Sequence, residues 1–111
     1  DKVFCKDIQL ECNTTGIAEE RSVKIAIRPE SILISQNKSN EQNCIHGTIK
    51  ENEFLGSFQR LYVESPSLSE ELLMIDIANT SQTNFDLNQG SMIYFIFPPD
   101  QIKVYPNSWI F

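Results

Sequence analysis

The sequence predicts an all-β fold, a small barrel or sandwich of short strands. Apolar and polar residues alternate with a period of two over most of the chain, which is the pattern of half-buried strands. Glycine and proline interrupt this alternation, and no long stretch has the period of an amphipathic helix. The length of 111 residues is that of one domain.

The first half of the chain contains two predicted strands and one tight corner. Residues 3–12 form a weak strand, and residues 23–27 alternate clearly between apolar and polar side chains. Pro29 cannot donate to a strand ladder and ends this second strand, and residues 29–33 suit one helical turn because proline favours the first helical position. Residues 36–43 are polar and predict an exposed loop.

The second half of the chain contains most of the predicted sheet. Residues 92–97 are apolar at every position, which is typical of a strand buried on both faces. Gly47 and Gly56 interrupt the strand pattern, and glycine there marks a bulge or bend that curves a sheet. The strands expected in this half are residues 44–54, 57–64, 72–78, 92–97 and 102–105.

The composition argues against two classes of protein. The formal net charge is −6, and the nine basic residues are scattered, whereas nucleic-acid binding needs clustered cations. No apolar run reaches the length of about 20 residues that a membrane helix needs. The three cysteines are odd in number and lack paired spacing, so we expect free thiols in a reducing compartment.

The residues that carry common enzyme chemistry are missing from the sequence. No phosphate-binding glycine-rich loop and no nucleophile elbow are present. His46 is the only histidine, so a histidine-based metal cluster cannot form. Glu70 and Glu71 indicate a solvated charge run rather than a paired catalytic acid. We therefore expect no catalytic site and no metal site in this chain.

The first candidate binding feature is the corner formed by Arg28, Pro29 and Glu30. The structural interpretation is an ion pair between Arg28 and Glu30 that fixes the corner, which would need partial burial to matter. The functional alternative presents Arg28 to an anion or a partner subunit, because its planar guanidinium matches carboxylates and oxyanions.

The second candidate feature is apolar. Residues 92–97 and the tail 109–111 are either a core strand and its cover, or a hydrophobic surface used for self-association. The candidate interface residues are Tyr94, Phe95, Phe97 and Trp109.

Three motifs in the same order give the chain a family resemblance. They are the corner Ile27-Arg28-Pro29-Glu30, the spacing from Gly47 to Gly56, and the ending Gly90-Ser91-Met92 followed by Pro98-Pro99-Asp100. In this respect the chain resembles TOBE domains, the transport-associated OB-like domains at the C-terminus of ATP-binding-cassette importer ATPases.

The resemblance implies an OB-like β-barrel and assigns roles to several residues. Residues 1–111 would form a single domain, with a lead-in segment and first strand at 1–20 and an apolar tail at 106–111. ATP and magnesium would bind a nucleotide-binding domain that is absent from this chain, which begins with Asp1 and is expected to be part of a longer protein. The signature corner is Arg28, Pro29 and Glu30, and the backbone bends are Gly47, Gly56 and Gly90.

The resemblance also implies a function. The domain would regulate and help to pair importer ATPase subunits that drive uptake of a small solute, with polyamine or ferric iron favoured. The alternative is a sensor for a small oxyanion or polyamine, of the molybdate-binding type. The implied partners are a second ATPase subunit, membrane permease subunits and a small-molecule effector, but no nucleic acid. The location would be cytoplasmic, on the inner face of the cell membrane.

Overall fold

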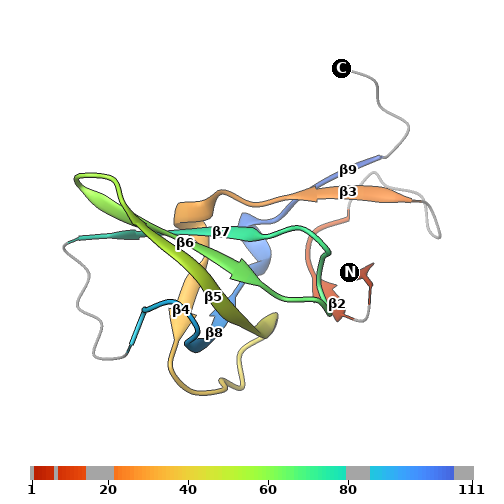
Figure 1. Cartoon of the computed structure of the whole chain (residues 1–111). Coiled ribbons are helices and arrows are strands. Elements are labelled where there is room, and N and C mark those ends of the chain that lie inside the picture. The colour runs from red at the N-terminus through yellow and green to blue at the C-terminus, as the bar shows by residue number, and fades with distance from the viewer. Residues whose placement is uncertain (1, 7, 15–21, 80–85, 107–111) are drawn as a thin grey trace.

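The computed structural model describes residues 2–6, 8–14, 22–79 and 86–106, which form short strands and two 3-10 turns (Figure 1). The described residues contain no helix with the length and apolar character needed to cross a bilayer. The strands are β1 (Lys2–Cys5), β2 (Ile8–Glu11), β3 (Val23–Ala26), β4 (Leu33–Ser35), β5 (Cys44–Phe54), β6 (Phe58–Glu64), β7 (Leu73–Ala78), β8 (Met92–Ile96) and β9 (Lys103–Pro106), and the turns are η1 (Pro29–Ser31) and η2 (Pro99–Gln101).

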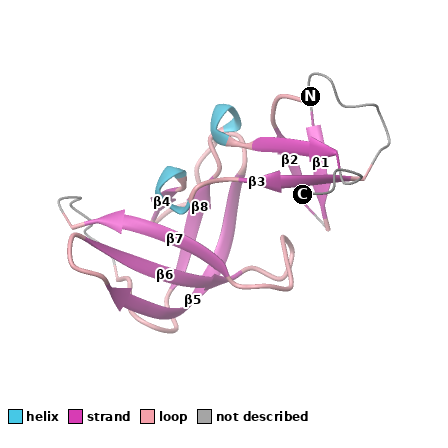
Figure 2. Ribbon diagram, turned by 90° about the horizontal axis from the view of Figure 1, so that it is seen from above, coloured by secondary structure: helices cyan, strands magenta, loops and turns pink. Residues whose placement is uncertain are grey.

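The strands form one five-stranded antiparallel sheet and two ribbons. The sheet has the order β4-β8-β5-β6-β7, and the ribbons are β1-β2 and β3-β9. Figure 2 shows the β3-β9 ribbon extending away from the sheet, with β1 and β2 beside it. The prediction of an all-β, OB-like fold of short antiparallel strands is confirmed.

The core lies on the inner face of the curved sheet. Alternate residues of the central strands point into it, as the period of two predicts. Phe95 is completely buried, and partly buried side chains from β3 and β9 pack against the same cluster. Its fully buried members on the sheet are Ile49, Leu61, Val63, Ile75, Ile93 and Phe95.

Two elements differ from the prediction. The single strand expected at residues 3–12 is a hairpin of β1 and β2, and Lys6 at its turn has a left-handed φ of 52°. A lysine there gives no sequence signal, because such turns usually carry glycine or asparagine. The three-residue strand β4 directly after η1 was also not predicted.

Strand β8 is not buried on both faces as its uniformly apolar sequence predicted. Met92 is 57% exposed and Tyr94 is half-buried, whereas Ile93 and Phe95 are completely buried. The outer face of this strand therefore keeps contact with solvent, and only the alternating inner positions and Ile96 belong to the buried part.

The three glycines predicted as bends have different roles. Gly56 and Gly90 have φ values of 84° and 92°, in turns where an L side chain would be strained. Gly47 instead lies in regular strand pairing opposite Ile93, and the register shift of β5 comes later, between Ile49 and Glu51. A β-carbon at Gly47 would lie 2.6 Å from a Val63 methyl group, so close packing requires this glycine.

Asn43 connects the β1-β2 hairpin to the sheet. Its side-chain oxygen accepts the Glu11 N–H at 2.7 Å, and its amide group donates to the carbonyls of Glu11 and Phe97, both at 2.8 Å. The backbone carbonyl of Asn43 also accepts the Phe97 N–H at 3.2 Å. Asn43 makes these contacts from a left-handed backbone conformation, with a φ of 62°, which asparagine tolerates. It thereby joins three segments of the chain.

The three cysteines are free thiols with different access to solvent. Burial raises the pKa of the Cys5 and Cys12 thiols, which lowers their thiolate fraction at neutral pH.

We expect Cys12 and Cys5 to react with Ellman's reagent more slowly in the native chain than in urea, with rates that rise as the pH is raised. Mass spectrometry of the labelled peptides measures the rate at each cysteine. Equal rates in the native and the unfolded chain at both cysteines would contradict this expectation.

Candidate functional site

The signature corner is one half of a double corner. The segments β3-η1-β4 and β8-η2-β9 run antiparallel, because β3 pairs with β9 and β4 pairs with β8. Each segment is bent by its 3-10 turn where it passes from the sheet to the ribbon (Figure 2). Both turns are built from the same local pattern.

The two turns have matching sequences and matching backbone geometry. Arg28-Pro29-Glu30-Ser31-Ile32 corresponds to Pro98-Pro99-Asp100-Gln101-Ile102. In each turn an extended residue precedes a proline at the first helical position, and the third following N–H closes the turn at 2.9 Å. The isoleucine after each turn is 4% exposed. Comparing these two pentapeptides would have revealed the second corner from the sequence.

The corner is not held by an ion pair between Arg28 and Glu30, so that structural prediction is wrong. Both side chains are exposed, and no salt bridge joins these two described residues. The fixed proline ring, the turn hydrogen bond from Ser31 N–H to Arg28 O, and the burial of Ile32 determine the chain direction instead.

An open groove of about 650 Å³ lies at the double corner. The cations Arg28 and Lys103 and the carboxylate of Glu30 line it together with neutral polar groups. The Ser31 hydroxyl donates a long hydrogen bond of 3.4 Å to Gln101 Oε1 between the two turns. The full lining is Ala26, Ile27, Arg28, Pro29, Glu30, Ser31, Gln101, Lys103 and Tyr105.

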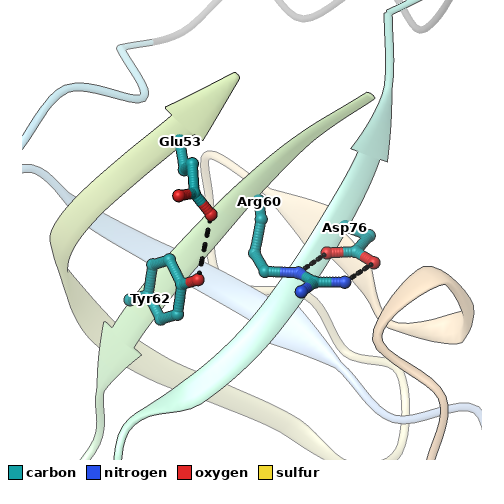
Figure 3. Close-up of polar contacts among 4 residues, drawn as sticks. All are labelled: Glu53, Arg60, Tyr62 and Asp76. Carbon is teal, nitrogen blue, oxygen red and sulfur yellow. Dashed lines mark hydrogen bonds and ion pairs between the residues drawn. The ribbon is translucent and has the colours of Figure 1, made fainter. Parts of the chain in front are cut away.

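A polar ladder crosses the outer face of β5, β6 and β7 (Figure 3). Arg60 donates two hydrogen bonds to Asp76, from Nε at 2.7 Å and from Nη2 at 3.0 Å, and its guanidinium lies 5.6 Å from the ring centre of Phe58. The Tyr62 hydroxyl donates to Glu53 at 3.1 Å.

The electrostatics of this ladder favour a structural role. The hydrogen bond to Asp76 raises the pKa of Arg60, and the hydrogen bond to Glu53 raises the pKa of Tyr62. Asp76 and Glu53 thus already engage side chains of the neighbouring strand, and the ladder ties three strands together.

The predicted interface residues that the structure describes differ in their exposure to solvent. Phe95 and Phe97 are 0% and 2% exposed, so the prediction that they form an accessible surface is wrong, and they belong to the core. Tyr94 is half-buried on the outer face, opposite His46, with ring centres 6.2 Å apart. Trp109 lies outside the described residues.

Two of the eight exposed large apolar side chains among the described residues are neighbours at one hairpin tip. Phe54 is 74% exposed and Leu55 is 38% exposed at the tip between β5 and β6. The tip is closed by the Leu55 N–H bond to Phe58 O, and the Asn79 amide group donates to Gly56 O. Two adjacent apolar residues before a turn glycine were the sequence signal for this exposed pair.

The described residues contain no group of three or more histidine, cysteine, aspartate or glutamate side chains that could hold a metal ion. His46 is exposed, and its ring centre lies 6.2 Å from that of Tyr94. The arrangement in this part of the chain therefore offers binding surfaces, and it does not bring together a catalytic acid, base or nucleophile.

Comparison with known families gives one match. A family model described as the TOBE domain matches residues 25–104, which covers the region from within β3 to within β9. A search of the curated proteins found no match. The matched region includes both 3-10 turns of the double corner, the complete five-stranded sheet and all of the groove lining except Tyr105.

Proposed function

Because the chain belongs to the TOBE domain family, we propose that it is a non-catalytic regulatory and subunit-association domain of an ATP-binding-cassette importer ATPase. The observation that carries the proposal is the match to the TOBE domain over residues 25–104. The exposed hairpin tip and the open groove support it, since both offer surfaces for binding.

The proposal places the chemistry in the parent protein. ATP and magnesium bind a separate nucleotide-binding domain, and this chain contributes contacts to a second copy of the subunit. The assembly works with integral-membrane permease subunits on the cytoplasmic face of the membrane. The resemblance of residues 54–57, with Arg60 and Val63, to the polyamine and ferric-iron importers favours those solutes.

Self-association tests the proposal directly. We expect the mass measured by light scattering during chromatography to rise from monomer toward dimer as the chain concentration increases. Phe54→Ser should weaken this association, because it removes an exposed apolar side chain that does not belong to the core. Phe4→Ser is the matched control, since Phe4 is similarly exposed, at 73%, on β1 outside the matched region.

Two results would count against the proposed role. A strict monomer at the highest soluble concentration would contradict subunit association by this domain. Equal weakening by Phe54→Ser and Phe4→Ser would show that association depends on general surface hydrophobicity rather than on the hairpin tip.

A further inference from the structure

The basic side chains of the described residues fall into two groups. Four are paired with carboxylates at nitrogen–oxygen distances of 2.7 to 3.7 Å, and these pairs are distributed over β1, the hairpin turn, β5 and β6. The paired residues are Lys2 with Glu11, Lys6 with Glu70, Lys50 with Glu64 and Arg60 with Asp76. Within the same described ranges, the cations outside these pairs are Lys24, Arg28, Lys38 and Lys103.

Three of these four unpaired cations lie together on one side of the ribbon and corner. Lys24 is directly opposite Tyr105, and Ala26 is directly opposite Lys103, so Lys24 and Lys103 share one face of the β3-β9 ribbon. Arg28 lines the groove at the end of that face, together with Lys103 and Tyr105. A locally positive surface thus exists on a chain whose net charge is −6.

The groove has the size and chemistry of a small-molecule site. Its volume of about 650 Å³ lies within the usual range for such sites. Arg28 and Lys103 supply two positive charges against the single negative charge of Glu30, so the lining carries an excess of one positive charge. Glu30 and the Ser31 hydroxyl oxygen can each accept a hydrogen bond from a ligand hydroxyl, and the side-chain N–H groups of Gln101 can donate to a ligand oxygen.

We propose that this groove binds a small hydroxylated anion, such as a sugar phosphate or a hydroxycarboxylate. The anionic group lies between Arg28 and Lys103, because a guanidinium and an ammonium both form charge-assisted hydrogen bonds with phosphate or carboxylate oxygens. The hydroxyl groups of the ligand face Glu30 and the two polar side chains of the turns. This gives the regulatory part of the proposed function a ligand class, and its biological meaning rests on that function.

Nuclear magnetic resonance titration of the labelled chain tests the inference. Glucose 6-phosphate and citrate are the probes, with glucose and inorganic phosphate as separate arms that distinguish the hydroxyl and anion contributions. We expect saturable amide shifts confined to residues 24–31 and 101–105 with both probes. Inorganic phosphate should bind more weakly at the same residues, and glucose should cause no saturable shift.

Matched variants make the result specific. Arg28→Gln and Lys103→Gln should each raise the dissociation constant about tenfold, as expected for the loss of one charge-assisted hydrogen bond. Lys50→Gln removes the same charge from a cation already paired with Glu64 and should leave the dissociation constant unchanged.

Three outcomes would overturn the inference: no saturable shift with either probe, shifts spread over other strands, or an equal effect of Lys50→Gln. Binding is measured on the chain alone, so a negative result leaves the association measured by light scattering untouched. Conversely, a strictly monomeric chain that still binds the probes would reject the association role and retain the groove.

Discussion

Gly47→Ala is expected to destabilise the chain by about 3 kcal/mol, at the upper end of the cost of overfilling a packed core. The added β-carbon would lie 2.6 Å from Val63 Cγ1, 2.8 Å from the backbone oxygen of Glu64 and 3.2 Å from a ring carbon of Phe95. A backbone oxygen of a paired strand cannot move without disturbing the sheet. Urea denaturation should show a midpoint lowered by on the order of 2 M with an unchanged slope.

Two further variants separate crowding from backbone strain. Gly56→Ala meets no atom within 4 Å but has a φ of 84°, so it should cost only about 1 kcal/mol. Val63→Ala removes the nearest methyl group, so the double variant with Gly47→Ala should be more stable than the sum of the two single effects by about 1 kcal/mol. Simple additivity, or a Gly47→Ala chain as stable as the original, would contradict the close-packing explanation.

Asn43→Ala is expected to lower the free energy of unfolding by about 4 kcal/mol. The substitution removes the side-chain partners of Glu11 N–H, Glu11 O and Phe97 O, and each lost bond of this kind costs about 1 kcal/mol. The φ of 62° adds a further penalty for alanine. Thermal unfolding should show the loss, and hydrogen exchange should show reduced protection of the Glu11 amide.

Variants of Asn43 divide this loss into its parts. Asn43→Gly keeps the left-handed backbone but removes all three bonds, so its difference from alanine measures the strain alone. Asn43→Asp keeps the acceptor for Glu11 N–H and places a carboxylate oxygen against two carbonyls. We expect aspartate to be at least as destabilising as alanine at neutral pH. A neutral effect of aspartate would mean that the two carbonyl contacts contribute nothing.

Local patterns were sufficient to predict most strands. The alternation of residues 73, 75 and 77 placed Leu73, Ile75 and Ile77 on one face, as observed, and Cys44–Phe54 was predicted with the bounds that β5 has. The 3-10 turn at Pro29 also followed from proline chemistry alone. These features depend on neighbours in the sequence, so the sequence contains their signal.

Features that depend on distant contacts were missed or misread. Asn43 binds residues that are 32 and 54 positions away, and nothing near residue 43 indicates those partners. Gly47 was predicted to be a bend, and its packing role was missed because the neighbours that require a glycine, Val63 and Phe95, are remote in the chain. The ion pair expected between Arg28 and Glu30 does not form, because the intervening Pro29 begins a tight turn between the two side chains.

Only part of the groove could be predicted from the sequence. Arg28 was identified from its own strand, but Gln101, Lys103 and Tyr105 come from the other end of the chain. Only the pairing of β3 with β9 brings them to Arg28.

The double corner has a mechanical consequence. A single bent strand could swivel about its backbone torsions, but two antiparallel strands that bend together restrain each other. Ile32 and Ile102, each buried directly after its turn, anchor both bends in the core. The β3-β9 ribbon and the sheet are therefore mechanically coupled, and a force applied to β3 or β9 would be transmitted as a torque to the sheet.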